Sequence, residues 1–271
     1  MTSFTHTQGQ SLPINAADIY VEIAGNPTGE PLVLLHGGLG NMMDFNAIVE
    51  HLPEQFQLIG IDFRGHGKST LGNAPLTYRQ YQADVEAVLD QLGITHYSVI
   101  GFSDGGITAL RLAAAQPSRI RALVTIGAHH QLAEDDPVLG MYAAMTASKW
   151  RALFPDNVAR YEATNPEPDF DRLVPAVVAL WTETAAYPGE AIHHITAPTL
   201  MVRGDQDHLC TRAHTLALGE SVPQAEFFNL PGTGHDVLNE APSLCMAGLT
   251  PFLLQHCTES GNAMAFSTSP A

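Results

Sequence analysis

The sequence predicts an α/β fold with a mostly parallel central sheet and helices on both of its faces. Short, continuously apolar runs at 32–35, 96–100 and 122–126 are typical of strands that are covered on both sides. Between such runs, apolar residues recur at helical spacing, as in 81–92, and Gly93 then ends the helix. Strands that alternate with helices along the chain indicate a parallel sheet between two helical layers.

The length and composition of the chain are sufficient for one large domain that carries an insertion. At 271 residues and 45% hydrophobic content, the chain can bury an extensive core. We expect this core from residues 1–127 and 195–257, and an inserted helical lid from residues 128–194. Residues 258–271 are rich in small polar side chains, and we expect them to be disordered.

The charge of the chain indicates which partners it can bind, and its cysteine content indicates the compartment in which it lies. The 28 acidic residues outnumber the 12 basic ones, for a formal charge of −16, which disfavours nucleic acids and anionic membranes as partners. No apolar run reaches the roughly 20 residues of a membrane span, and residues 1–15 lack the apolar core and the arginines of targeting peptides. The three cysteines lack metal-ligand spacing and favour free thiols in a reducing compartment. We therefore expect a soluble, cytoplasmic protein.

The first strands lead into a loop that is rich in glycine. Residues 19–24 alternate apolar and polar side chains, as an edge strand does, and a turn-rich connection separates them from the buried strand at 32–35. The latter strand runs into the stretch 36–40, whose bare backbone N–H groups could face a cavity, as an oxyanion hole requires. A plain turn is the alternative. We place Gly37 and Leu39 of this stretch beside a substrate.

The next strand, 57–61, ends in a polar stretch, 62–69. Asp62 and His66 in this stretch are residue types that also act in catalysis. We expect them instead to pin the loop by hydrogen bonds.

The stretch around Ser103 is the strongest chemical signal in the chain. The strand at 96–100 stops at a Gly-x-Ser-x-Gly pattern, and apolar residues recur at helical spacing directly after it. A strand that turns straight into a helix around a serine is a nucleophile elbow. Side chains at Gly101 and Gly105 would crowd the backbone of so tight a turn. Ser103 is therefore predicted as a nucleophile at a helix N-terminus that favours negative charge. The alternative, a serine that only caps the helix, leaves the two glycines unexplained.

Residues 128–194 lack a clear strand pattern, and their apolar residues recur at helical intervals between prolines. We expect short helices that form a lid over the carboxyl edge of the sheet, with Trp150 beside the substrate. Ordinary surface helices are the alternative. The histidine pairs 129–130 and 193–194 have no carboxylate at ligand spacing on a shared helix, so we expect no metal site.

The sheet resumes with strands at 198–204 and 226–230, and a helix closes the fold. Asp205 and Asp207 follow the first of these strands, and His235 follows the second. The carboxyl ends of parallel strands lie on one edge of a sheet, so side chains at these ends can meet although they are far apart in sequence.

The chain order of serine, aspartate and histidine matches the hydrolase form of the catalytic triad. In such a triad, His235 would take the proton of Ser103 and later return it to the leaving group. A carboxylate, from Asp205 or Asp207, would hold the imidazole in the required tautomer and stabilise the imidazolium.

These motifs resemble the α/β-hydrolase superfamily over residues 19–255. The matching stretches are His36-Gly37-Gly38, Asp62-Phe63-Arg64-Gly65-His66-Gly67-Lys68-Ser69, Gly101-Phe102-Ser103-Asp104-Gly105-Gly106, Gly204-Asp205-Gln206-Asp207 and Gly234-His235. The resemblance implies that Asp207 is the acid and that the backbone N–H groups of Asp104 and Gly38 bind the oxyanion. It also implies a small-molecule ester substrate and no cofactor. The serine at the elbow differs from the aspartate that haloalkane dehalogenases and epoxide hydrolases use there.

A closer resemblance is to the valacyclovir-hydrolase (biphenyl hydrolase-like) branch, although the helices after Trp150 do not share it. The similar stretches are 103–110, 127–129, 134–136 and 148–150. That branch hydrolyses α-amino acid esters and holds the substrate's ammonium with the aspartate beside the nucleophile, here Asp104. A carboxylate about 5.5 Å from the oxyanion would repel it by on the order of 3 kcal/mol at an effective dielectric near 20. A substrate ammonium would neutralise this charge. The alternative is that Asp104 only favours the helix N-terminus, an effect of about 0.3–1 kcal/mol.

We therefore expect a serine hydrolase that cleaves carboxylic esters through an acyl-enzyme intermediate and prefers α-amino acid esters through Asp104. A general carboxylesterase, or a hydrolase of the carbon–carbon bond in ring-cleavage diketones, would use the same triad with a different lid pocket. A scaffold that only binds a ligand is the remaining alternative, and such a scaffold usually lacks a triad member.

Overall fold

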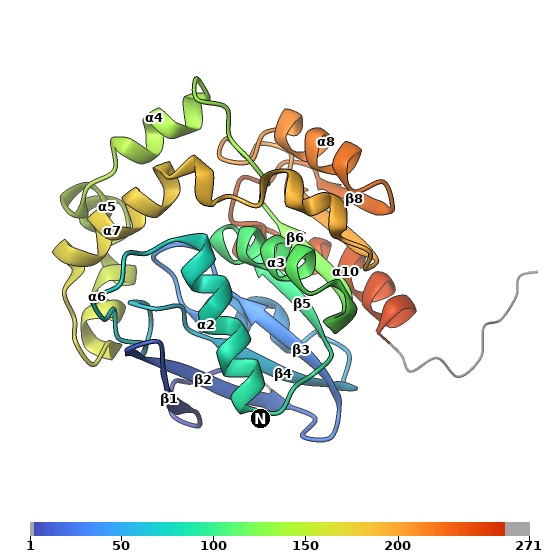
Figure 1. Ribbon diagram of the computed structural model, residues 1–271, viewed down its shortest axis with the longest axis horizontal. Helices are drawn as coiled ribbons and strands as arrows, with labels where there is room; N and C mark the ends of the chain where they lie inside the picture. Colours follow the sequence, from blue (N-terminus) through green and yellow to red (C-terminus); the bar gives the residue numbers. More distant parts are fainter. Residues whose placement is uncertain (1–2, 258–271) are drawn as a thin grey trace, which may run out of the picture.

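The computed structural model describes residues 3–257, which form an eight-stranded sheet with helices on both faces (Figure 1). The strands lie in the order β1-β2-β4-β3-β5-β6-β7-β8. Their bounds are β1 (Gln10–Ile14), β2 (Ala17–Gly25), β3 (Glu30–Leu35), β4 (Phe56–Ile61), β5 (Tyr97–Phe102), β6 (Ile120–Ile126), β7 (Thr199–Gly204) and β8 (Ala225–Leu230). The pairs β1–β2 and β2–β4 are antiparallel, and the pairs from β4 onward in this order are parallel. The predicted, mostly parallel α/β sheet is confirmed. The predicted disorder of residues 258–271 concerns a stretch outside the described residues.

Strand β1 is absent from the sequence-based prediction. It lies at the edge of the sheet, its residues are mostly exposed or half-buried, and it contains Pro13. Neither an apolar run nor a clean alternation therefore marks it. Backbone pairing with β2, in which Leu12 lies opposite Ile19, decides its place.

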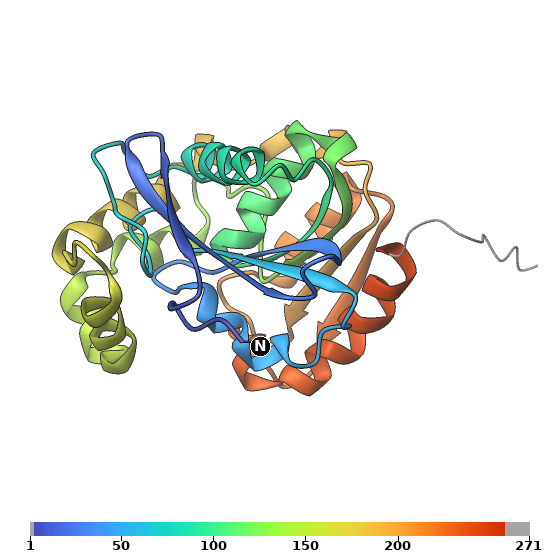
Figure 2. The same ribbon diagram turned by 90° about the horizontal axis from the view of Figure 1, so that it is seen from below.

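Helices cover both faces of the sheet (Figure 2). Successive residues of a strand point to opposite faces, and strand β3 shows this clearly. Val33 and Leu35 belong to the core beneath α2 and α3, whereas Leu32 and Leu34 belong to the core beside α1 and α10. The helices of the core are η1 (Met42–Phe45), α1 (Asn46–Val49), α2 (Tyr78–Gln91), α3 (Asp104–Ala115), η2 (Pro117–Arg119), α8 (Arg212–Ser221), α9 (Val237–Glu240) and α10 (Pro242–His256).

Residues 128–194 contain helices and connecting turns, without a strand. The helices are α4 (Pro137–Ala143), α5 (Ala147–Leu153), α6 (Pro155–Thr164), α7 (Phe170–Thr182), η3 (Thr184–Ala186) and η4 (Gly189–His194). Side chains cap three of them, since Asp136, Thr146 and Asp169 each accept a backbone N–H at a helix start. Helices α4–α7 gather at one end of the molecule, far from α10 (Figure 1). That this helical insertion acts as a lid stays a prediction.

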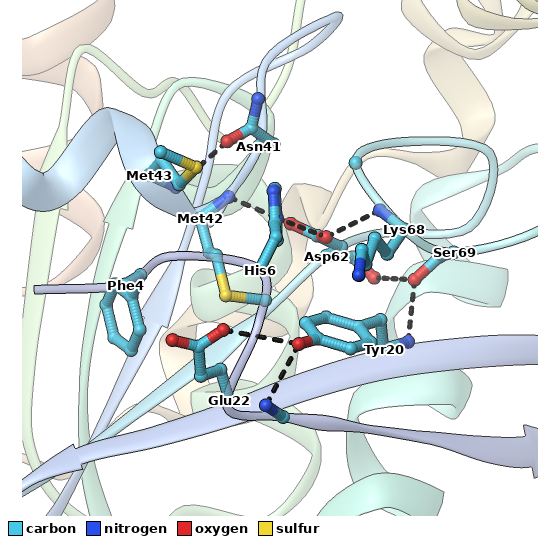
Figure 3. Close-up of polar contacts among 12 residues, drawn as sticks. Phe4, His6, Tyr20, Glu22, Asn41, Met42, Met43, Asp62, Lys68 and Ser69 are labelled. Carbon is cyan, nitrogen blue, oxygen red and sulfur yellow. Dashed lines mark hydrogen bonds and ion pairs between the residues drawn. The ribbon is translucent and has the colours of Figure 1, made fainter. Parts of the chain in front are cut away.

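The N-terminal segment and the loop after β4 meet at Asp62 (Figure 3). Its buried carboxylate accepts the backbone N–H groups of Met42 at 2.9 Å and Lys68 at 2.8 Å, and His6 Nε2 lies 2.8 Å from it. In the same loop, His66 Nδ1 donates to a backbone carbonyl at 2.9 Å. The expected hydrogen bonds of Asp62 and His66 in this loop are present. Because Met42 begins η1, Asp62 also holds the chain just beyond the glycine-rich stretch.

Two further expectations from the sequence concern free cysteine thiols and membrane-spanning helices. Cys210, Cys245 and Cys257 are buried and form no disulfide. Within residues 3–257, no helix has the length and apolar character that crossing a membrane requires.

Candidate active site

Ser103 lies between strand β5 and helix α3, in the sharp turn that the sequence predicts. Its φ of +52° and ψ of −116° are unusual for a residue with a side chain, and such a conformation costs about 1–3 kcal/mol. A Cβ at Gly101 would lie 2.2 Å from the carbonyl oxygen of Gly105, and a Cβ at Gly105 would lie 1.9 Å from that of Leu35. The close packing of β3, β5 and α3 therefore holds the strained serine, and both glycines are needed for it.

We expect Gly105→Ala to lower the free energy of unfolding by about 4 kcal/mol or more, because the new methyl group meets backbone that cannot move aside. Gly140→Ala is the matched control, since a Cβ at Gly140 in helix α4 meets nothing within 4 Å. Alanine is the better helix former, so this control should gain up to about 1 kcal/mol. Urea denaturation measures both. Equal stability of the two variants would contradict the packing described for the elbow.

Ser103, His235 and Asp207 meet at the carboxyl edge of the sheet in one chain of hydrogen bonds. His235, in the loop after β8, has its Nε2 3.0 Å from Ser103 Oγ and its Nδ1 2.8 Å from Asp207 Oδ2. When Nδ1 carries the proton and donates to Asp207, Nε2 is free to accept the proton of the serine hydroxyl. This arrangement can make a nucleophile of Ser103.

Of the two aspartates that follow β7, Asp207 is the one that contacts His235. Its side chain is fully buried, and its other oxygen accepts two backbone N–H groups of the same loop at 2.8 and 2.9 Å. Burial raises the pKa of Asp207, but the hydrogen bonds from His235 and from these N–H groups outweigh burial and hold the pKa below its usual value. Asp205 is partly exposed and pairs with Arg212 instead. The structure thus brings Asp207, and not Asp205, into contact with His235, and the role of Asp207 as the acid stays a prediction.

The glycine-rich stretch after strand β3 lies directly against the elbow. A Cβ at Gly37 would lie 3.2 Å from the Cβ of Ser103, and a Cβ at Gly38 would lie 2.5 Å from Oδ2 of Asp104. Leu39 is buried and has a φ of +59°. The backbone of Gly38 therefore lies next to the start of helix α3, as a pair of oxyanion-binding N–H groups requires. The oxyanion and substrate-binding roles of these residues stay predictions.

The carboxylate of Asp104 is buried beside the nucleophile and contacts two aromatic side chains that the sequence analysis missed. The Tyr78 hydroxyl donates to it at 2.8 Å, and Trp181 Nε1 donates at 2.9 and 3.0 Å to its two oxygens. Burial raises the pKa of Asp104 to about 6, although the hydrogen bonds from Trp181 and Tyr78 lower it. Both aromatic residues occupy apolar helix positions typical of core, so no local pattern marks them as site residues.

Trp150, predicted beside the substrate, makes its contacts within the helical insertion. Its Nε1 donates to Asn157 at 3.0 Å, which joins α5 to α6. Its ring centroid lies 4.7 Å from that of Phe154 and 6.5 Å from that of Trp181. A role for Trp150 in substrate binding stays a prediction.

The histidine pairs of the insertion lie in separate environments. His129 is buried and stacks on Tyr187 with ring centroids 5.3 Å apart, whereas His193 is exposed and bonds to Glu190 at 3.0 Å. Across residues 3–257, no group of three or more histidine, cysteine, aspartate or glutamate side chains is arranged to hold a metal ion.

Comparisons with known proteins agree with the fold and the strand-to-helix turn described above. A family model described as the alpha/beta hydrolase fold matches residues 30–160. This match and the relatives that follow support the α/β-hydrolase superfamily for this chain. A putative esterase/lipase of Haemophilus influenzae is 24% identical to it over 238 residues, which are 82% of each protein. A proline iminopeptidase of Xylella fastidiosa is 32% identical over 179 residues, which cover 65% of this chain and 54% of that protein.

Solved structures share the fold at low sequence identity. A meta-cleavage product hydrolase from Pseudomonas fluorescens superposes with a TM-score of 0.78 at 20% identity, over 92% of this chain and 98% of that one. An esterase from Thermogutta terrifontis gives a TM-score of 0.74 at 19% identity, over 93% and 100% of the two chains. The predicted α/β-hydrolase fold is confirmed, and the protein is a hydrolase. The resemblance to the valacyclovir-hydrolase branch stays a prediction.

Proposed function

We propose that the protein is a serine hydrolase of carboxylic esters that works through an acyl-enzyme intermediate. The chain of hydrogen bonds from Ser103 Oγ through His235 to Asp207 carries this proposal. In the first step, Oγ attacks the ester carbonyl carbon while His235 Nε2 takes the hydroxyl proton. The carboxylate of Asp207 stabilises the imidazolium that forms. The tetrahedral intermediate then expels the alcohol, which takes the proton from Nε2 as the acyl-enzyme forms.

Water completes the reaction by the same route. His235 takes a proton from the water that attacks the acyl carbon, and it returns this proton to Ser103 Oγ when the carboxylic acid leaves. In both steps, negative charge develops on the carbonyl oxygen. The backbone N–H groups of Gly38 and Asp104 would bind this oxyanion, and the loss of one such donor typically costs about 10²–10³ in kcat.

Asp104 supports a preference for α-amino acid esters as the finer part of the proposal. Among the described residues, the hydrogen-bond partners of its carboxylate are the Tyr78 hydroxyl and the Trp181 indole, which are both neutral. A buried carboxylate without a cationic partner is costly. An ammonium group beside the substrate's carbonyl would supply the missing charge, and the aromatic rings would add to its attraction.

A general carboxylesterase is the second candidate, and the surroundings of the Asp104 carboxylate favour it. Both oxygens of Asp104 already accept hydrogen bonds, and the residue is only 3% exposed. In that case, the carboxylate would serve to hold helix α7 against the elbow, and a substrate amine would contribute nothing.

The hydrolysis of paired esters, with and without an amino group, distinguishes these two candidate functions. We expect phenylalanine methyl ester to exceed its des-amino analogue, methyl 3-phenylpropanoate, in kcat/KM by about tenfold or more at pH 7. Because the pKa of Asp104 is raised to about 6, the carboxylate is charged above this pH and neutral below it. The preference should therefore fade at pH 5 and in Asp104→Asn. Equal kcat/KM for the two esters in the wild type would identify a general carboxylesterase.

A further inference from the structure

Trp181, on helix α7 of the insertion, contacts both chain segments that would bind the oxyanion. Its Nε1 donates to the two carboxylate oxygens of Asp104 at 3.0 and 2.9 Å. Its benzene ring lies against the other segment, since a Cβ at Gly38 would be 2.8 Å from Cζ2 and 3.2 Å from Cε2. Trp181 is 7% exposed. One buried side chain of the insertion therefore packs on the start of α3 and on the glycine-rich stretch.

The two segments meet from the core side as well. A Cβ at Gly105 would lie 1.9 Å from the carbonyl oxygen of Leu35, so α3 begins directly on the end of β3. On the side of the insertion, Trp181 bonds to the Asp104 carboxylate. Gly38 thus lies against both the Asp104 carboxylate and the Trp181 indole.

We propose that Trp181 is a positioning residue for the oxyanion hole, a role that rests on the proposed ester hydrolysis. The N–H groups of Gly38 and Asp104 belong to different segments, and both must point at the same oxygen. Catalytic groups need to be held within about 0.5 Å of their productive geometry. The Trp181 N–H fixes the Asp104 side chain and its ring limits the movement of Gly38, so the indole holds the two donors in register.

Trp181 is itself held firmly by the insertion and by its neighbours. The Tyr187 hydroxyl donates to the Trp181 carbonyl at 2.9 Å, and the Tyr142 ring centroid lies 5.1 Å from that of Trp181. The Tyr78 hydroxyl also donates to the Asp104 carboxylate, at 2.8 Å. The Tyr78 and Tyr187 rings are in turn 4.9 Å apart. A rigid support of this kind can transmit its position to the carboxylate.

The groups that face the Asp104 carboxylate define the expected pH behaviour. Tyr78 from α2 and Trp181 from α7 donate to it, and the nearby His235 also lowers the pKa of Asp104, against the larger effect of burial. The hydroxyls of Tyr81 and Tyr187 are near enough for the carboxylate to raise their own pKa values. Removal of the indole N–H would therefore raise the pKa of Asp104 further above the value of about 6.

Trp181→Phe tests the role, because it keeps an aromatic ring and removes the N–H donor. We expect kcat for an ester to fall by about 10- to 100-fold, while KM changes less than about threefold, because the ground-state carbonyl needs the oxyanion donors least. A boronic acid forms a tetrahedral adduct with serine, and its affinity should fall in parallel with kcat. The control is Tyr161→Phe, which loses the hydrogen bond that the Tyr161 hydroxyl accepts from the Asp169 N–H within the same insertion, and it should keep kcat within about twofold.

Fluorescence tests the contact without relying on activity or on a variant of Trp181. The chain has two tryptophans, so in Trp150→Phe the emission reports on Trp181 alone. This emission should change with pH around 6, as Asp104 ionises, and the change should vanish when Asp104→Asn is added. Emission that does not follow Asp104 would overturn the contact on which the inference depends.

The outcomes separate this inference from the proposed function. If the wild type hydrolyses no ester, the proposed function fails and this role fails with it. If the wild type is active but Trp181→Phe matches Tyr161→Phe in kcat, only the positioning role is overturned. A loss confined to KM would also overturn it, since that result would make Trp181 part of the substrate pocket.

Discussion

Ser103→Ala is expected to lower kcat for ester hydrolysis by about 10⁴-fold or more while the fold stays intact. The hydroxyl oxygen that His235 Nε2 contacts at 3.0 Å is the proposed nucleophile, and alanine removes it. Alanine keeps the Cβ, so the unusual φ of +52° imposes the same strain on both residues. The stability of the variant should therefore remain close to that of the wild type.

A second serine of the same strand provides the control. Ser98 is buried on β5 and its Oγ lies 3.0 Å from Cys257 Sγ, away from the elbow. Ser98→Ala should keep kcat within a few fold. The measurement is kcat with a chromogenic ester, together with mass spectrometry of the trapped acyl-enzyme, whose added mass should map to Ser103. Turnover by Ser103→Ala above about a tenth of the wild-type rate would contradict the proposed mechanism.

Asp207→Asn is expected to lower kcat by about 10⁴-fold, far more than Asp205→Asn. One oxygen of Asp207 accepts two backbone N–H groups, and the other accepts the Nδ1 proton of His235. In the variant, the oxygen of the new amide would stay on the backbone donors and its NH₂ group would face Nδ1. The imidazole proton would then move to Nε2 and point at Ser103, so His235 could no longer act as a base.

The Asp205→Asn variant separates this tautomer effect from a general loss of charge in the loop. The Asp205 side chain bonds to Arg212 and Asn229, outside the contacts of His235. We expect kcat within about threefold of the wild type, measured in the same assay. If the two substitutions ranked in the opposite order, Asp205 would be the acid and the observed hydrogen bond to Asp207 would have no catalytic meaning.

The position of the proposed nucleophile could be predicted because its requirements are local. A glycine on each side of Ser103 is needed wherever a strand turns into a helix within three residues, and the distances at Gly101 and Gly105 confirm this reason. The convergence of Ser103 with His235 follows from the rule that parallel strands end on one edge of a sheet.

Other features had no local signal. Strand β1 pairs through its backbone at an exposed edge, so its side chains show no pattern that could predict it. The residues alone left Asp205 and Asp207 as equal candidates, because both lie in one loop and differ only in where the folded loop points them. The structure turns Asp207 towards His235 and Asp205 towards Arg212.

By itself, the sequence determined the parallel sheet, the sharp strand-to-helix turn at Ser103 and the sheet edge where Ser103, Asp207 and His235 converge. Each of these depends on spacing within a few residues or on the direction of a strand. Only the tertiary structure decided what surrounds Asp104, since Tyr78 and Trp181 come from helices far from it in the chain. Their side chains reach the carboxylate because of how α2 and α7 pack. Packing depends on the shapes of whole apolar surfaces, and these carry no signature in the order of residues around any one site.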